Sequence, residues 1–258
     1  MDSRGRNMRK YVGWIAAGLI GLILISAGVY WRFANPSHSA QSSKVSENPY
    51  DSSYYEALSP GSASSAAQIL PEVVRLIAPK SAVDLGSGTG EWLGELRKLG
   101  VIDVIGVDGD WVDRAALKIP TDQFKPIDLR NKLVMDRTFD LAISVETAEH
   151  LPPERGEGFV ADLVALAPVV LFSAAIPGQG GADHINEQWQ DYWARLFAKH
   201  NYVALDCLRL KFWNDSRVEY WYRQNIILYV RRDRVEADPK LQFLASLQPP
   251  EVIRFQRK

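Results

Sequence analysis

The chain has 258 residues, of which 47% are hydrophobic, so its length suffices for one well-buried domain with appendages. Its 30 lysines and arginines are balanced by 31 aspartates and glutamates, and this balance argues against a nucleic acid as a partner. The single cysteine, Cys207, excludes a disulfide within the chain. The four histidines and this cysteine show no spacing typical of a zinc site, so we predict no metal site.

The first element in chain order is an uncharged apolar segment from Tyr11 to Trp31, which carries aromatic residues at both ends. A helix of about 20 apolar residues spans a bilayer core, whereas the apolar part of a cleaved signal peptide usually has about 7–15 residues. We therefore predict a single-pass membrane anchor within residues 1–33. Residues 34–60 are rich in Ser, Pro and Asn and have no apolar periodicity, so they are predicted to form a flexible linker to a domain over 61–258.

From residue 61 onward, helical and strand patterns alternate. Helices are predicted over 65–77, 91–99, 111–117, 154–167 and 187–200, and strands over 82–85, 102–107, 123–127, 139–145, 169–175, 204–212 and 225–231. Continuous apolar strands such as 169–175 are typical of a parallel sheet that is covered on both faces. The last two strands are joined without a crossover helix, so they are predicted to be antiparallel.

The most informative motif is V-D-L-G-S-G-T-G-E at 83–91, where a buried strand meets a glycine loop and the start of a helix. Glycine lacks a Cβ, so Gly86, Gly88 and Gly90 let a ligand lie against the main chain. The dinucleotide motif G-x-G-x-x-G requires glycine where this chain has Glu91. An acidic residue at the helix start also disfavours a diphosphate. The motif therefore favours a cationic ligand.

Acidic residues also follow the first three predicted strands. Asp84 closes the first strand, and Asp108 lies about 20 residues after Gly88, a distance typical of a carboxylate that accepts hydrogen bonds from ribose hydroxyls. Asp128 closes the third strand in P-I-D-L. With F-D-L-A-I-S-V at 139–145, this ordered set resembles the class I S-adenosylmethionine-dependent methyltransferases, over about residues 66–231.

The resemblance implies an α/β fold with a doubly wound, seven-stranded, mostly parallel sheet that ends in an antiparallel hairpin. It also implies S-adenosylmethionine as the cofactor. It assigns Gly86, Ser87, Gly88 and Gly90 to the methionine part, Asp108 to the ribose, Asp128 and Leu129 to the adenine, and Val145 and Glu146 to the lining after the fourth strand. The predicted cofactor-binding residues also include Asp84 and Gly109. In this family the leading segment often covers the cofactor, so Tyr50, Tyr54 and Tyr55 could dock there instead of belonging to a linker.

The acceptor is expected to bind beside I-P-G-Q-G-G-A-D-H-I-N-E-Q-W at 176–189, which follows the fifth strand. The string resembles uncharacterised bacterial methyltransferases, some associated with polysaccharide or secondary-metabolite pathways, and this resemblance specifies no acceptor. We predict methyl transfer to an oxygen or nitrogen atom of a small molecule or glycan. His184 and His150 are equal candidates for a general base. Asn186 could cap the following helix. A carboxylate acceptor would need no base.

The sidedness of the anchor has two conflicting indications. Arg4, Arg6, Arg9 and Lys10 precede the apolar segment, and the positive-inside rule then places the amino terminus in the cytoplasm and the domain outside. S-adenosylmethionine is expected in the cytoplasm, and on this ground we predict a cytoplasmic domain.

Two alternatives stay open for the function. The domain could be a cofactor-binding scaffold without activity, or a dinucleotide-dependent oxidoreductase, which Glu91 disfavours.

Overall fold

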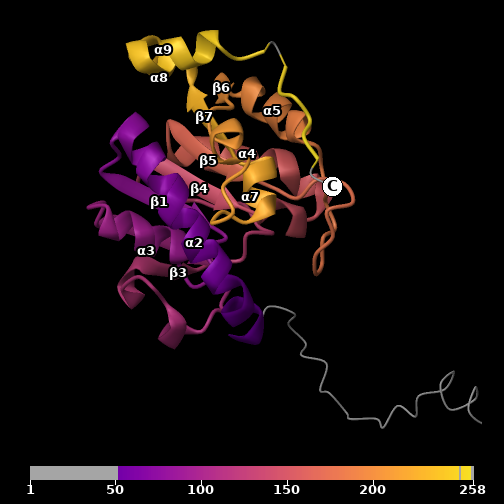
Figure 1. Cartoon of the computed structure of the whole chain (residues 1–258). Helices are drawn as coiled ribbons and strands as arrows, with labels where there is room; N and C mark the ends of the chain where they lie inside the picture. Colours follow the sequence, from indigo (N-terminus) through magenta and orange to yellow (C-terminus); the bar gives the residue numbers. More distant parts are fainter. Residues whose placement is uncertain (1–51, 250, 257–258) are drawn as a thin grey trace, which may run out of the picture. The chain divides into compact units, whose positions relative to one another are not determined.

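Figure 1 shows the computed structural model of the chain, in which residues 52–249 and 251–256 are described. The predicted anchor at 11–31 lies outside the described residues. Among the described helices, none is both long and apolar enough to cross a membrane.

The core of the fold is a seven-stranded sheet with the order β3-β2-β1-β4-β5-β7-β6. Its strands are β1 (Ser81–Leu85), β2 (Asp103–Asp108), β3 (Phe124–Pro126), β4 (Leu141–Val145), β5 (Val169–Ser173), β6 (Tyr202–Leu205) and β7 (Ile227–Arg231). The strands from β3 to β5 pair in parallel, whereas β7 is antiparallel to both β5 and β6. The predicted mostly parallel sheet with an antiparallel end is therefore confirmed.

The strand order places a ligand site at the carboxyl ends of β1 and β4. From β1 the chain continues to β2 and β3 on one side, and it then returns to place β4 on the other side of β1. The connections after β1 and β4 therefore diverge from the centre of the sheet. In open α/β sheets a crevice forms at such a switch point, outside the carboxyl ends of the strands.

Both faces of the sheet are covered, as the apolar strands predict. The helices are α2 (Ser52–Ile77), α3 (Glu91–Lys98), α4 (Gly156–Leu166), α5 (Gln190–Lys199), α6 (Arg209–Phe212), α7 (Tyr220–Asn225), α8 (Arg232–Glu236) and α9 (Pro239–Ser246). One apolar cluster joins Ala82 and Leu141 of the sheet to residues of α2 and α3. The second joins the alternate positions Val83 and Ala142 to α4 and α5. This alternation along the strands divides the core into two layers.

The predicted linker over 34–60 requires a correction at its end, because residues 52–60 already form the first turns of α2. This part of the helix is polar and includes Pro60, so its sequence has no helical apolar pattern. Its polar side chains bind the domain instead. The Ser59 hydroxyl donates to Glu91 at 2.5 Å, and Ser62 Oγ lies 3.0 Å from the Tyr222 hydroxyl.

The predicted strand over 204–212 is wrong beyond residue 205, and the link to β7 holds two short helices, α6 and α7. The cause is the burial of Arg209. Its side chain is fully buried, and its guanidinium donates to the distant Ile253 carbonyl at 3.0 Å and to both oxygens of the nearby Asp206 at 2.8 and 2.5 Å. Two further predicted helices are shorter in the structure. The helix expected over 111–117 is a 3-10 turn at Arg114–Ala116, and α5 begins at Gln190 instead of residue 187.

The aromatic layer between α5 and β7 provides a test of the packing. Phe197 is fully buried and stacks on Tyr229 with ring centroids 3.9 Å apart. We expect Phe197→Ala to lower the free energy of unfolding by about 3–5 kcal/mol, since it leaves a cavity in the core. Urea denaturation of the purified chain measures this change.

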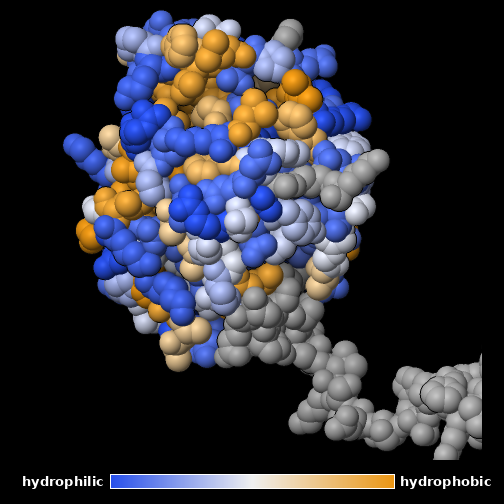
Figure 2. All heavy atoms as spheres, in the orientation of Figure 1, coloured by the Kyte–Doolittle hydropathy of each residue, from blue (hydrophilic) through white to orange (hydrophobic). Residues whose placement is uncertain are grey.

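Phe243→Ala is the matched control. Phe243 is 62% exposed on α9, and Figure 2 shows hydrophobic side chains gathered over the end of the molecule that carries α8 and α9. Its replacement should change the free energy of unfolding by no more than about 0.5 kcal/mol. Equal effects of the two substitutions would contradict the layer arrangement described above.

Candidate functional site

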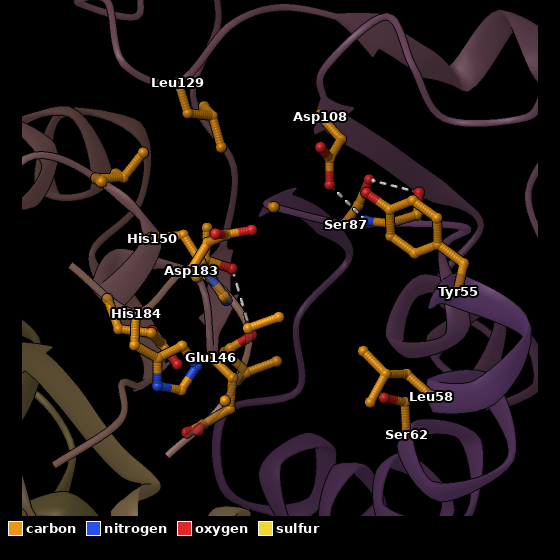
Figure 3. Close-up of a pocket in the computed structure, with 18 of the residues that line it drawn as sticks. Tyr55, Leu58, Ser62, Ser87, Asp108, Leu129, Glu146, His150, Asp183 and His184 are labelled. Atoms are coloured by element: carbon orange, nitrogen blue, oxygen red, sulfur yellow. Dashed lines mark hydrogen bonds between the residues drawn. The ribbon is translucent and has the colours of Figure 1, made fainter. Parts of the chain in front are cut away.

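A cavity of about 1140 Å³ lies at the carboxyl ends of the parallel strands. The loops after β1, β2, β3, β4 and β5 line it together with the first turns of α2. Figure 3 shows Ser87, Asp108 and Tyr55 on one side of this cavity and Glu146, His150 and His184 on the other. The cavity is therefore placed where the strand order predicts a ligand site, and it has two chemically different sides.

The glycine loop after β1 fits closely against the loop after β4. Gly86 has a φ of +86°, and a Cβ at this position would lie 2.2 Å from Thr147 Oγ1. No other residue type combines this backbone conformation with so close an approach. The Gly86 amide donates to the Val107 carbonyl at 2.8 Å, which fixes the loop to β2. The loop then enters α3 through Gly90, which has a left-handed conformation and does not itself line the cavity.

Asp108 connects the glycine loop to the end of β2. Its carboxylate accepts hydrogen bonds from the backbone amides of Gly88 at 2.7 Å and Gly109 at 2.6 Å. A carboxylate has about four lone-pair positions, so it retains capacity for hydroxyl donors of a ligand. Burial raises the pKa of Asp108 to about 6, although the two amide donors act in the opposite direction. Bonds to ligand hydroxyls would favour the charged form.

Asp84 lies outside the lining of the cavity. Its side chain is 1% exposed, and neither carboxylate oxygen has a hydrogen-bond partner among the described residues. Burial raises the pKa of Asp84 well above its ordinary value, and the nearby Asp108 charge adds to this effect. The structure thus places Asp84 beneath the loop instead of at the ligand surface.

Asp128 and Leu129 line the cavity after β3, as predicted. The Asp128 carboxylate already accepts hydrogen bonds from the Arg130 guanidinium, with Nη2 at 2.8 Å, and this partner lowers its pKa. Leu129 is 7% exposed and offers an apolar surface. A ring placed here would therefore meet Leu129 and the pair of charged side chains at the edge.

Glu146 directly follows β4 in an unusual backbone conformation, and its carboxylate is held in place by hydrogen bonds. Its φ is +50°, which is uncommon for a residue with a side chain and typical of strained functional positions. The side-chain amides of Gln179 and Asn225 donate to its two oxygens at 2.7 and 3.2 Å. Burial raises the pKa of Glu146, while these donors lower it. Val145, which precedes it, also lines the cavity.

The two candidate bases, His150 and His184, lie together on this side of the cavity with ring centroids 4.9 Å apart. Burial lowers the pKa of His150 to about 4, and the neighbouring His184 contributes to the shift. His184 Nδ1 lies 3.1 Å from Glu187 Oε1. A base with so low a pKa is a weak proton acceptor at neutral pH, so His150 is disfavoured. The geometry favours His184, whose ring Glu187 orients.

The loop that carries His184 is fixed to the residues after β4. The amides of Ile185 and Asn186 both donate to the Glu149 carbonyl, at 2.9 and 3.0 Å. The predicted capping role of Asn186 is wrong, because α5 begins at Gln190 and the Asn186 amide group donates to the Ala148 carbonyl at 3.4 Å. Asn186 therefore holds the loop against the 3-10 turn Ala148–His150.

Two aromatic residues that line the cavity, Tyr55 and Trp111, are not among the cofactor-binding residues predicted from the sequence. Tyr55 of α2 lies over the glycine loop, since a Cβ at Gly88 would be 3.0 Å from its ring. The Trp111 indole donates to the Tyr55 hydroxyl at 3.2 Å. Of the three tyrosines considered as a cover for the cofactor, Tyr55 thus contacts the loop. Tyr50 and the side chain of Tyr54 lie outside the described residues.

Comparisons with known proteins find a matching family and solved structures that resemble this chain. A protein family described as a methyltransferase domain matches residues 63–203. The sugar N-methyltransferase from Streptoalloteichus sp ATCC 53650 superposes with a TM-score of 0.54 at 15% identity, over 69% of this chain and 91% of that one. Magnesium protoporphyrin IX methyltransferase from Synechocystis PCC 6803 with bound SAH gives a TM-score of 0.47 at 16% identity, over 66% and 84%. A search of curated proteins finds no match.

The contact between the two loops provides a test of the site's construction. We expect Gly86→Ala to destabilise the chain far more than Gly100→Ala. Both glycines have positive φ values, +86° and +93°, but a Cβ at Gly100 meets nothing within 4 Å. Gly100→Ala should therefore cost only the conformational strain of about 1–2 kcal/mol. Chemical denaturation compares the two variants, and similar losses would show that Thr147 does not press against the loop.

Proposed function

Because this chain belongs to the class I S-adenosylmethionine-dependent methyltransferases, we propose that it methylates an oxygen or nitrogen atom of a small-molecule or glycan acceptor. Its cofactor is S-adenosylmethionine. The observation that carries the proposal is the hydrogen bond from the Gly88 amide to the Asp108 carboxylate, at 2.7 Å, which joins the glycine loop to the end of β2. The acceptor class is supported by the predicted loop at 176–189 and by the likeness to a sugar N-methyltransferase.

The residues around the cavity fit this cofactor. The main chain at Gly86 and Gly88 is accessible on the cavity side, and Asp108 beside it retains lone pairs for the ribose hydroxyls. Leu129 and Asp128 would contact the adenine. The lining also holds Glu91, Glu146 and Glu149, while its Arg130 is paired with Asp128, which suits a cation better than a diphosphate. When bound, S-adenosylmethionine supplies a methyl group on a positively charged sulfur.

The opposite side of the cavity would receive the acceptor. Glu146, held by Gln179 and Asn225, places a fixed acceptor of hydrogen bonds there, and it can bind a hydroxyl or amine donor. Correct placement of two reactants can contribute about 7–11 kcal/mol in ideal systems, so positioning is the main task of these residues. His184 would take the proton of a protonated acceptor, with Glu187 holding the ring.

We further propose that residues 11–31 anchor the domain to a membrane and that the domain lies on the cytoplasmic side. The support is the length of the uncharged apolar segment and the cytoplasmic supply of the cofactor. The anchor would hold the domain near a lipid or a membrane-bound glycan acceptor.

The ribose assignment predicts a loss of affinity for S-adenosylhomocysteine in Asp108→Ala. Charge-assisted hydrogen bonds contribute about 1.5–3 kcal/mol each, so the dissociation constant should rise by about tenfold or more. Isothermal titration calorimetry measures it. Asp110→Ala is the control, because the side chain of Asp110 is 90% exposed and is not among the residues that line the cavity. Unchanged affinity in Asp108→Ala would refute the assignment, and binding of NADH would favour an oxidoreductase.

The activity itself is tested with S-adenosylmethionine labelled on the methyl group, added to the chain and an extract of the host. We expect a product that carries the labelled methyl group as a methyl ether or an N-methyl amine, identified by mass spectrometry. With that product as the assay, His184→Ala should lower kcat about 10²–10⁴-fold while leaving the affinity for S-adenosylhomocysteine intact. Cofactor binding without any labelled product, across a broad acceptor panel, would instead support a scaffold.

A further inference from the structure

We propose that Glu149, His150 and His184 bind a divalent transition-metal ion on the acceptor side of the cavity. Binding would depend on these three side chains alone. The role of the ion, which is to hold and activate the acceptor, rests on the proposed function. The sequence predicted no metal site, because spacing along the chain does not reveal ligands that only the fold brings together.

The ligand set comes from two separate loops. Glu149 and His150 lie in the 3-10 turn Ala148–His150 after β4, whereas His184 lies in the loop between β5 and α5. One carboxylate oxygen and one imidazole nitrogen of each histidine all lie within 4.8 Å of one another. Ligand atoms at about 2.0–2.2 Å from one ion are at most about 4.4 Å apart, so small side-chain rotations suffice to close the site.

The chemistry of the set indicates the class of ion. Two imidazoles and one carboxylate are typical ligands of catalytic zinc and of other first-row divalent ions, and they leave coordination positions open for a substrate. His150 and His184 both line the cavity, so the open positions would face it. Magnesium and calcium prefer oxygen ligands and fit this set less well.

The Glu149 carboxylate is otherwise unexplained. The residue is fully buried, and neither oxygen makes a hydrogen bond of normal geometry with a described residue. The backbone of Ala175 lies near enough to favour the charged carboxylate, whereas the neighbouring Glu146 carboxylate opposes its charge. A buried carboxylate without a partner is costly, whereas an adjacent cation would compensate its charge. The neighbouring Glu146 shows the contrast, because two side-chain amides satisfy its oxygens. Glu149 also lines the cavity, and one of its oxygens lies within 4.8 Å of a ring nitrogen of each histidine.

The surroundings of the two histidines match those of metal ligands. A histidine ligand usually donates its second ring N–H to a carboxylate or a backbone carbonyl, which fixes the ring and the tautomer. His184 Nδ1 has Glu187 Oε1 at 3.1 Å, and His150 has a hydrogen bond with the backbone of Asp183. The amide of Gly178 donates in turn to Glu187 at 2.7 Å.

Gly181 allows the His184 ring to pack against the loop after β5. A Cβ at this position would lie 2.3 Å from Nε2 of His184, and its φ is +148°. The glycine therefore lets the imidazole lie against the main chain, close to His150. An ion bound here could coordinate an acceptor oxygen or nitrogen and lower the pKa of its proton, which then passes to solvent as the methyl group is transferred. With the ion bound, the ion instead of His184 would promote loss of the acceptor proton.

The test uses the full chain, with any affinity tag removed, after treatment with EDTA and dialysis. Zn²⁺ and Mn²⁺ are titrated by calorimetry, and Co²⁺ is followed through its visible d–d absorption, which reports the ligand geometry. We expect one ion per chain. Glu149→Gln, which keeps the side-chain shape, and His184→Ala should each weaken binding at least about tenfold. His200→Ala is the control, because His200 ends α5 and is not among the residues that line the cavity.

The outcomes separate this proposal from the proposed function, because S-adenosylhomocysteine binding is measured on the same EDTA-treated chain. Binding of S-adenosylhomocysteine without any bound ion would overturn the metal site and leave the methyltransferase assignment intact. An ion bound in the absence of cofactor binding would support the site and contradict the assigned function. Equal affinity of the wild type and Glu149→Gln, with both folded by circular dichroism, would also overturn the metal site.

Discussion

The hydrogen bond from the Gly88 amide to the Asp108 carboxylate is the interaction on which the site depends. It joins the loop after β1 to the end of β2 and leaves the remaining lone pairs of the carboxylate toward the cavity. The sheet makes this bond possible, because β1 and β2 are parallel neighbours and their carboxyl ends meet at one edge. Thr147, in the loop after β4, packs against the glycine loop. Its side chain occupies the space beside Gly86 into which a Cβ would project.

One side of the cavity carries the residues proposed to bind the cofactor, and the other side carries the residues proposed to act on the acceptor. The glycine loop, Asp108 and Leu129 form a surface that suits an adenosyl group. The opposite side holds Glu146, Glu149 and the two histidines, where ionisable groups are concentrated and the backbone of Glu146 is strained. Strain and buried charge are tolerated where the surrounding structure determines them, and such places are often functional. The loops after β4 and β5 together build this side, linked by the two amides that donate to the Glu149 carbonyl.

The sequence predicted those parts of the fold that short-range patterns determine. Apolar strands such as 169–173, the glycine loop and the acids that close β1 and β2 follow directly from local residue types. Elements fixed by distant contacts were less accessible. The first turns of α2 depend on hydrogen bonds to Glu91 and Tyr222, and α6 replaces a predicted strand where Arg209 is buried and donates to the Ile253 carbonyl. The same reason applies to Glu149 and His184, which lie 35 positions apart in the sequence yet share one cluster.

A crystal structure of the full chain with S-adenosylhomocysteine tests the central claim most directly. It should show the ribose hydroxyls within hydrogen-bond distance of Asp108, the methionine part along Gly86 and Gly88, and the thioether sulfur facing His184 across the cavity. Electron density for the ligand at another place, with the glycine loop and Asp108 untouched, would contradict the account.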